Sequence, residues 1–272
     1  MDIATLKTGI IGGGAMAENI LRGVLEAGTL SPAQITVSDI HGDRLKYISK
    51  TFSVSTVRDN VELVSGSDLL ILAVKPQNMR MLLEEIKKTS TDSKLYLSIA
   101  AGVTAASIAQ GLDNKGRIIR IMPNLAARVL KSASAVSMGP GATQDDLGIA
   151  KTVFEAIGQT VVINEDLMDA VTGLSGSGPA YFFLIIEALA DAGVKSGLTR
   201  PVAQSLAAQT ALGAAQLVLE SGGSPATLKD QVTSPGGTTI SGMHVLEKGG
   251  VRGALMDAVL AAVERSKELG KQ

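Results

Sequence analysis

The sequence predicts an α/β fold in which an N-terminal doubly wound sheet is followed by an all-helical C-terminal domain. Up to Ile163, short apolar runs alternate with amphipathic segments of helical length, the pattern of βα units in a parallel sheet covered by helices. After Ile163 the strand signals stop, and long Ala-rich stretches punctuated by Gly and Pro take over. The 272 residues therefore divide into two predicted domains, residues 1–163 and residues 164–272.

The predicted strands are short and apolar, and helices lie between them. They are Thr8–Ile11, Ile35–Ser38, Ser53–Ser55, Leu69–Ala73, Leu95–Ile99 and Ile118–Ile121. Two further apolar runs, Ala133–Met138 and Thr160–Ile163, flank a predicted helix at Thr143–Ile157 and extend the sheet at one edge.

A glycine-rich turn follows the first strand. Gly12, Gly14 and Ala17 fit the G-x-G-x-x-G/A pattern of Rossmann-type dinucleotide sites. Gly12 can adopt the turn conformation, Gly14 has no side chain where a pyrophosphate must approach, and Ala17 lets the next helix sit close to the sheet. The N-terminus of that helix offers N–H groups and a partial positive charge to phosphates. Because the match lies in the first βα unit, it favours dinucleotide binding over a purely structural turn.

Asp39, directly after the second strand, is the type of residue that bonds the adenosine ribose in NAD enzymes. Ser38, His41 and Arg44 lie in the same loop and helix start, where a hydroxyl and cations could receive a 2′-phosphate instead. These signals conflict, and we predict NADPH as the cofactor with NADH as the alternative. Asp39 and Asp43 could instead cap a helix that begins near Asp43.

A polar loop, Ala73-Val74-Lys75-Pro76-Gln77, ends a buried strand at the carboxyl edge of the predicted sheet, where ligands bind in such folds. We expect this loop to meet the cofactor, with Lys75 as a solvated charge rather than a group that takes part in the chemistry. Asn60 precedes a predicted helix from Val61, and it either faces the adenosine or caps that helix.

The predicted helices after Ile163 carry small residues on several faces, as in Ala203, Ala207, Ala211 and Gly213. A single helix pair cannot cover all of these faces. A compact monomeric bundle is the alternative, but the second domain has few bulky aromatic side chains with which to fill a core. We therefore expect a homo-oligomer.

Composition limits the classes of partner and chemistry. The formal net charge of −1 argues against binding to nucleic acid or to an anionic membrane. The absence of cysteine excludes disulfides and zinc–thiolate sites, and the spacing of His41 and His244 suits neither a metal nor a catalytic triad. The N-terminal residues lack the pattern of a secretion signal, and no stretch approaches the roughly 18 consecutive apolar residues of a membrane span. We expect a soluble, cytoplasmic protein that acts on a small molecule without a metal.

Several motifs occur in order along the chain. They are Gly12–Met16, Ala73–Gln77, Ser98–Val103, Arg120–Asn124, Leu174–Tyr181 and Leu228–Thr239. Together they resemble the pyrroline-5-carboxylate reductase family over essentially the whole chain. The first motif is shared with many dehydrogenases, whereas the last two are far more specific.

The resemblance implies an oxidoreductase that reduces the C=N bond of 1-pyrroline-5-carboxylate to L-proline, the last step of proline biosynthesis, by hydride transfer from NAD(P)H. It also implies helical domains that interlock as homodimers, which often assemble further. It places the substrate carboxylate against Ser234, Gly237 and Thr238, with the Thr239 hydroxyl near the ring nitrogen. Thr239 and Ser234 are thus the predicted catalytic residues, and Ser177 joins the predicted substrate-binding set.

The cofactor-binding residues that the fold and the resemblance predict come from five segments. They are Gly12, Gly14, Ala15, Met16, Ser38, Asp39, Asn60, Ala73, Val74, Lys75, Pro76, Met122, Pro123 and Asn124.

The segment Ser234–Thr239 suits a small carboxylate on physical grounds as well. Glycines let backbone N–H groups converge at the start of a helix predicted from about Thr238, and the nearby hydroxyls add further donors. A simple interhelical turn is the alternative interpretation. Ser175 and Ser177 could likewise be helix caps.

One departure from the family pattern follows Asn124, where Leu125-Ala126 replace the usual Thr-Pro. This region is expected near the nicotinamide, so the departure bears on pocket detail and cofactor preference.

Two other functions remain open at this point. One is a β-hydroxyacid dehydrogenase with Lys195 as its acid or base, although the place of Lys195 at a helix end explains its charge without catalysis. The other is a non-enzymatic NAD(P)-sensing dimer.

Overall fold

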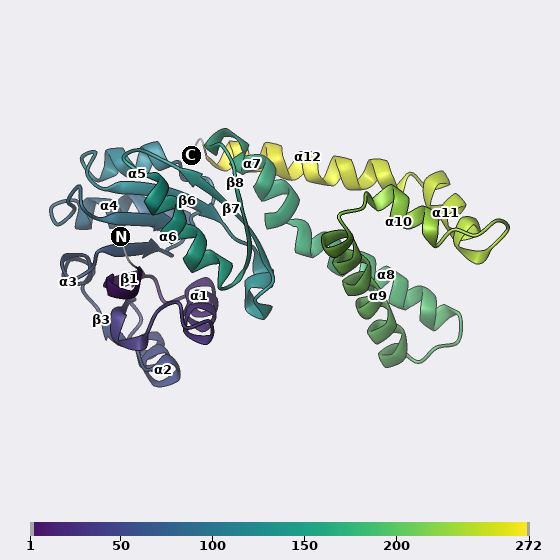
Figure 1. Ribbon diagram of the computed structural model, residues 1–272, viewed down its shortest axis with the longest axis horizontal. Coiled ribbons are helices and arrows are strands. Elements are labelled where there is room, and N and C mark those ends of the chain that lie inside the picture. The colour runs from purple at the N-terminus through teal and green to yellow at the C-terminus, as the bar shows by residue number, and fades with distance from the viewer. Residues whose placement is uncertain (1–2, 271–272) are drawn as a thin grey trace. The chain divides into compact units, whose positions relative to one another are not determined.

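The computed structural model describes residues 3–270, in which strands and helices alternate up to β8 and only helices follow (Figure 1). The strands are β1 Thr8–Ile11, β2 Ile35–Ser38, β3 Ser55–Val57, β4 Leu69–Leu72, β5 Leu95–Ser98, β6 Arg117–Met122, β7 Ser132–Met138 and β8 Gly158–Val162. The helices are α1 Ala15–Glu26, α2 Gly42–Phe52, α3 Asn60–Ser65, α4 Met79–Ile86, α5 Ala105–Gly111, α6 Gln144–Glu155, α7 Met168–Val171, α8 Gly178–Lys195, α9 Arg200–Ser221, α10 Pro225–Gln231, α11 Thr238–Lys248 and α12 Val251–Leu269.

The eight strands form one sheet in the order β3-β2-β1-β4-β5-β6-β7-β8. All neighbours are parallel except β6 and β7, which run antiparallel and add β7 and β8 at one edge. The chain moves outward in one direction from β1 to β3 and in the other direction from β4, so the switch point lies between β1 and β4. The predicted doubly wound α/β fold and its edge extension are confirmed.

Helices cover both faces of the sheet because their apolar residues recur every three or four positions. In α1, for example, Ala17, Ile20, Leu21 and Val24 are fully buried. These side chains share one apolar cluster with residues of α2 and α6, whereas α3, α4 and α5 contribute to a second cluster. Burying each large aliphatic side chain contributes about 1.5–3 kcal/mol, so these two clusters hold the sheet and helices together.

The predicted strands match the observed ones within one or two residues, and the third strand shows the largest shift. The prediction of Ser53–Ser55 was wrong, because β3 begins at Ser55. Ser53 has a φ of 57°, the left-handed conformation, and it is the C-cap of α2. Polarity alone does not distinguish such a cap from the start of a strand.

The start of α6 combines a capping box with an ion pair to strand β6. Thr143 is its N-cap, and its hydroxyl accepts a hydrogen bond from Asp146 N (3.3 Å) while the Asp146 carboxylate accepts one from Thr143 N (2.8 Å). The same buried carboxylate pairs with the Arg117 guanidinium of β6 at 2.7 Å. The capping box therefore also ties α6 to the sheet.

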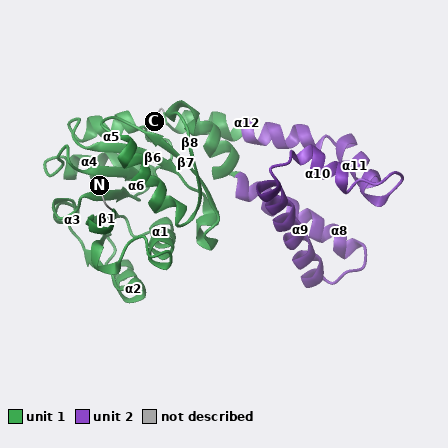
Figure 2. Cartoon of the chain, viewed as in Figure 1, with its two compact units in different colours: residues 1–177, 261–272 green, residues 178–260 purple. Residues whose placement is uncertain are grey.

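The chain divides into two compact units (Figure 2). Residues 1–177 and 261–272 form the sheet unit, and residues 178–260 form the helical unit. Residues 164–177 belong to the sheet unit by their contacts, since the Ser266 hydroxyl of α12 donates to the Asp169 carboxylate of α7 at 2.6 Å. The boundary at residue 163 that the sequence predicts follows the change from strands to helices, and it stays a prediction about domain organisation.

The helical unit has little core of its own. Its buried cluster consists of Ala190, Ala203 and Ala207, with Ile186 and Val194 packed against them. Large apolar side chains on the same helices are exposed instead: Phe182, Phe183, Leu184, Leu189, Leu206, Leu212, Leu217 and Leu219. Large apolar side chains exposed in this number are typical of a protein interface.

Gly158 provides a stability test of the sheet edge. Its φ is 153°, and a Cβ atom there would overlap the backbone of Ser132 on β7. We expect Gly158→Ala to lower the free energy of unfolding by about 2–4 kcal/mol. Gly148→Ala is the matched control, because Gly148 lies in α6 with open space around it and should gain about 0.5–1 kcal/mol. Urea unfolding measures both; equal stability of the two variants would contradict the strain at Gly158.

Candidate active site

The glycine turn between β1 and α1 lies at the switch point of the sheet. Gly12 has a φ of 99°, and a Cβ atom there would stand 2.7 Å from the Ala73 carbonyl oxygen at the end of β4. Its N–H donates to the Ser38 carbonyl at the end of β2 (2.8 Å). Gly14, the N-cap of α1, has no neighbouring atom within 4 Å of the Cβ position. The turn is thus closely packed at Gly12 and open at Gly14, as a pyrophosphate site requires.

The Asp39 side chain stabilises this turn through a hydrogen bond. Its Oδ2 accepts a hydrogen bond from Gly13 N (2.7 Å), and its Oδ1 accepts one from His41 N (2.8 Å). Burial raises the pKa of Asp39, but the hydrogen bonds from His41 and Gly13 outweigh it, and the net pKa lies below the usual range. Asp39 is therefore a carboxylate at neutral pH. It does not act as a helix cap, and Asp43 is an exposed residue of the first turn of α2.

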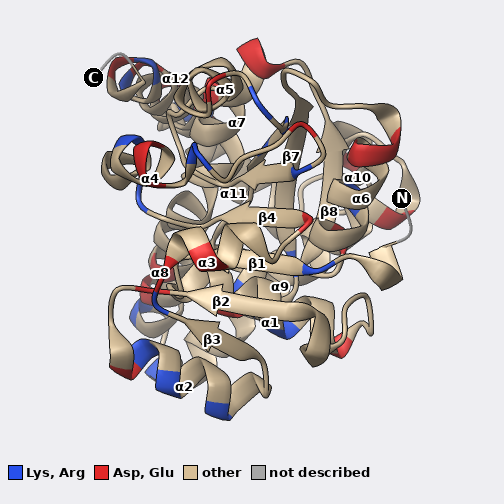
Figure 3. Ribbon diagram, turned by 90° about the vertical axis from the view of Figure 1, so that its left-hand side faces the viewer, with Lys and Arg blue, Asp and Glu red and all other residues tan. Residues whose placement is uncertain are grey.

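The cationic Arg44 is already engaged by the chain. Its Nε donates to the Gly13 carbonyl, and its guanidinium pairs with Glu18 of α1 at 2.5 Å. The same guanidinium lies 4.8 Å from the centre of the Tyr47 ring. Basic side chains are frequent along α2, as Figure 3 shows. Arg44 thus contacts the glycine turn through the Gly13 carbonyl, whereas Asp39 contacts it through the Gly13 N–H.

Two predicted cofactor residues meet at the ends of β2 and β3. The buried Ser38 hydroxyl donates to Asn60 Oδ1 at 2.7 Å, and Asn60 Nδ2 donates to Glu85 of α4 at 3.0 Å. The interpretation of Asn60 as a helix cap was wrong, because Asp59 accepts the N–H groups of Val61 and Glu62 at the start of α3. Its amide remains a predicted contact for the adenosine.

The loop after β4 approaches the glycine turn directly. Ala73 N donates to the Ile11 carbonyl (2.8 Å), and the Val74 backbone lies beside Gly12. Lys75 is exposed and precedes a 3₁₀ turn, Pro76–Asn78. The structure thus brings Gly12, Ser38, Asn60 and Ala73 to one edge of the sheet, although these predicted residues come from four separate segments.

Asn124, at the end of β6, lies in a different network. Its Oδ1 accepts a hydrogen bond from Ala126 N (3.1 Å), and its Nδ2 donates to the Ser175 carbonyl (3.0 Å). The departure from the family pattern has a physical consequence here. A proline at the position of Ala126 would have no N–H, so the bond to Asn124 Oδ1 could not form.

The segment Ser234–Thr239 is a tight turn that leads into α11. Gly237 N donates to the Ser234 carbonyl (3.1 Å), Pro235 takes the second position, and Gly236 has a φ of 67°, the features of a type II turn. Helix α11 begins at Thr238 with Gly237 as its N-cap, and no side chain caps it. The segment is therefore both the interhelical turn and the helix start that the sequence predicts. Ser234 and Thr238 are exposed, and Thr239 is half-buried.

Other candidates show less functional geometry. Ser175 does not cap a helix N-terminus, because its hydroxyl donates to the Val171 carbonyl (3.2 Å). Lys195 ends α8, and His244 lies exposed on α11. Among residues 3–270, no group of three or more His, Cys, Asp or Glu side chains could hold a metal ion.

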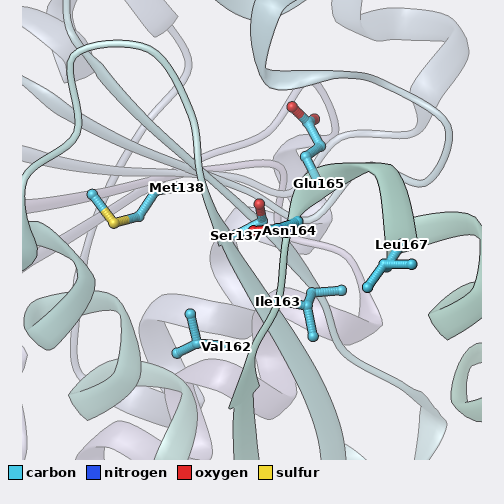
Figure 4. Close-up of a pocket in the computed structure, with 7 residues that line it drawn as sticks. All are labelled: Ser137, Met138, Val162, Ile163, Asn164, Glu165 and Leu167. Atoms are coloured by element: carbon cyan, nitrogen blue, oxygen red, sulfur yellow. The ribbon is translucent and has the colours of Figure 1, made fainter.

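Two surface cavities are lined by residues of the sheet unit other than those of the glycine turn. The first has a volume of about 470 Å³ and is lined by residues at the ends of β7 and β8 and the turn that follows (Figure 4). The Glu165 carboxylate there is engaged, since it pairs with the buried Arg120 at 3.3 Å and accepts a hydrogen bond from Ala105 N at 2.7 Å. The second cavity, of about 500 Å³, lies between α2 and β3. Neither contains the predicted substrate residues.

A glycine turn at the switch point of a doubly wound sheet defines the class, a dinucleotide-dependent oxidoreductase fold. Residues 7–102 match the family model "NADP oxidoreductase coenzyme F420-dependent", and residues 165–269 match "Pyrroline-5-carboxylate reductase dimerisation". A pyrroline-5-carboxylate reductase of Methanosarcina acetivorans is 48% identical over 266 residues, which cover 98% of each chain. The chain belongs to the pyrroline-5-carboxylate reductase family.

Two solved structures match the fold of this chain over nearly its full length. The structure of a pyrroline-5-carboxylate reductase from Coxiella burnetii has a TM-score of 0.93 and 38% identity, covering 97% of this chain and 98% of that one. The Plasmodium falciparum pyrroline carboxylate reductase with NADP bound has a TM-score of 0.87 and 31% identity, covering 98% of both chains.

The dimerisation family also bears on the apolar helices. Two stretches, Glu165–Lys195 and Arg200–Ser221, are long and apolar enough to cross a membrane by length and composition, and only 17% and 11% of their most apolar windows are buried within one chain. Both stretches lie entirely within the dimerisation match, residues 165–269. An interface between subunits accounts for apolar helices that one chain leaves exposed.

The contrast between Gly14 and Gly12 gives a direct test of the cofactor site. Gly14→Ala should leave the melting temperature within about 2 °C, because the Cβ position is open, yet raise the Kd for NADPH at least about tenfold by filling the phosphate approach. Gly12→Ala should lower the melting temperature as well, because its Cβ would press on the Ala73 backbone. Thermal unfolding and NADPH fluorescence titration check both, and unchanged NADPH affinity in Gly14→Ala would remove the turn from the site.

Proposed function

We propose that this chain is a pyrroline-5-carboxylate reductase, which reduces 1-pyrroline-5-carboxylate to L-proline as the last step of proline biosynthesis. The observation that carries the proposal is similarity to enzymes of this name along nearly the full length of both chains. That similarity includes the glycine turn in the sheet unit and the segment Ser234–Thr239 in the helical unit. Neither a β-hydroxyacid dehydrogenase nor a nucleotide sensor without activity is favoured by any feature of the structure.

The residues of the sheet unit fit a dinucleotide cofactor. The open position at Gly14 and the N-terminus of α1 suit the pyrophosphate, and Ser38, Asp39 and Asn60 suit the adenosine end. We propose NADPH with NADH as the alternative, supported by the NADP oxidoreductase match and by the NADP-bound relative. When bound, the dihydronicotinamide supplies the hydride that reduces the C=N carbon.

The segment Ser234–Thr239 has the chemistry to bind the substrate carboxylate. The first-turn N–H groups of α11 and the hydroxyls of Ser234, Thr238 and Thr239 provide donors within one short stretch. In this proposal Thr239 lies near the ring nitrogen and Ser177 adds a further contact. A protonated imine is already electrophilic, so these residues contribute mainly by orienting the substrate.

We further propose that the protein works as a homodimer or a larger homo-oligomer in the cytoplasm. The dimerisation match and the exposed apolar side chains of α8 and α9 support association. The net charge of −1 gives no support for a nucleic acid partner.

Oxidation of NADPH and NADH, each measured with 1-pyrroline-5-carboxylate, tests the reaction and the cofactor together. We expect turnover with NADPH, and no oxidation of either cofactor would refute the proposed function. Thr239→Ala should lower kcat/KM for the imine about tenfold or more, because it removes a hydroxyl from the substrate side only. The Kd for NADPH should change less than about twofold. The exposed Thr227→Ala on α10 serves as the control, and equal kinetics of the two variants would exclude Thr239 from the site.

Association has its own test. Leu212 and Leu219 lie two helical turns apart on α9 and are 56% and 67% exposed in the single chain. The double change Leu212→Glu and Leu219→Glu should shift the protein to monomers in light scattering, because charges would have to be buried at the interface. Met81→Glu, at a 71% exposed position on α4 of the sheet unit, is the control that should stay associated. A wild-type monomer at micromolar concentration would contradict the proposal.

A further inference from the structure

Pro179 removes one hydrogen-bond donor from the start of α8. In a regular α-helix, the Ser175 carbonyl would accept a hydrogen bond from the N–H group four residues later. That residue is Pro179, which has no N–H. The preceding residues, Thr172–Gly176, form a π-helical turn in which Ser177 N donates to the Thr172 carbonyl five residues back at 2.9 Å. The Ser175 carbonyl has therefore lost its α-helical donor.

The amide of Asn124 replaces that donor. Its Nδ2 lies 3.0 Å from the Ser175 carbonyl oxygen, although the two residues are 51 positions apart in the chain. Asn124 as a residue is only 9% exposed, so water competes little for this bond. The turn also lies directly on the strand end, because a Cβ atom on Gly176 would stand 2.9 Å from Met122 Cε.

Asn124 itself is held by further hydrogen bonds. Its Oδ1 is held by Ala126 N at 3.1 Å, and its own backbone N–H donates to the Ser132 hydroxyl at 3.1 Å. Ser132 is in turn bonded to the buried Ser134 hydroxyl at 3.0 Å. The hydrogen bond to Ala126 N fixes the amide oxygen, so the amide nitrogen points toward the Ser175 carbonyl.

We propose that Asn124 is a positioning residue that fixes the π-helical turn against the end of β6, and through that turn the Ser177 hydroxyl. It is not a direct contact of the cofactor. This inference rests on the proposed function, in which Ser177 contributes to substrate binding. One side chain would then link the end of β6 to the turn that carries the proposed substrate residue Ser177.

A double-variant cycle tests the inference. Asn124→Ala should lower kcat/KM for 1-pyrroline-5-carboxylate about tenfold, while the Kd for NADPH changes less than about twofold. Pro179→Ala restores a backbone N–H that can donate to the Ser175 carbonyl. The double variant should therefore recover most of the activity that Asn124→Ala loses. Ser90→Ala removes the buried hydrogen bond to the Tyr96 hydroxyl (2.8 Å), which involves neither Asn124 nor Ser175, and it should keep wild-type kcat/KM even if its melting temperature falls.

Asn124→Asp adds a readout that a loss of stability alone would not produce. The carboxylate repels the Ser175 carbonyl, whereas the protonated acid can donate to it. Its activity relative to the wild type should therefore rise as the pH falls from 8 to 5.5. A parallel loss of NADPH affinity in Asn124→Ala, or no recovery in the double variant, would overturn the inference. Turnover of the wild-type protein reports separately on the proposed function. The melting temperatures of the wild type, Asn124→Ala, Pro179→Ala and the double variant report on the Ser175 hydrogen bond without any substrate.

Discussion

The hydrogen bond between Gly13 N–H and the Asp39 carboxylate connects the first two βα units of the sheet. Gly12 has a positive φ and packs against the Ala73 backbone at the end of β4, while Asp39 and Arg44 bond the N–H and the carbonyl of the next residue, Gly13. These bonds stabilise the turn that precedes Gly14 and α1. Asp39, the predicted contact of the ribose, is therefore also a hydrogen-bond partner of the turn that is proposed to bind the pyrophosphate.

Polar side chains at the ends of parallel strands join the parts of the candidate site. Ser38 and Asn60 are bonded at the ends of β2 and β3, Ala73 meets Gly12 across β1 and β4, and Asn124 leaves the end of β6. The sheet brings these groups to one edge because all of its strands from β3 to β6 point the same way. A ligand that lies across the ends of several strands can therefore contact groups from each of them.

The sequence allowed most of the fold to be predicted, because apolar runs and glycine turns encode strands and their ends locally. The third strand was misplaced since the left-handed cap at Ser53 has no signature in polarity. For the site, the glycine turn and the helix start at Thr238 were predicted from spacing. The hydrogen-bond partners of Asn60 and Asn124 were not, because they lie 22 and 51 residues away and depend on the packing of whole elements. The missing N–H of Pro179 was the one available signal that Ser175 needed a distant donor.

The helical unit is an insertion in the sheet unit rather than a tail. The chain leaves the sheet unit after Ser177 and returns to it through α12, where Ser266 is bonded to Asp169. Both ends of the inserted helices are thus anchored, and the entropy cost of closing that long loop is met by contacts in the sheet unit. Removing the last turns of α12 would convert a closed loop into a chain held at one end only. The stability of the sheet unit and the ordering of the helices that associate with a second subunit are therefore coupled through the C-terminal helix.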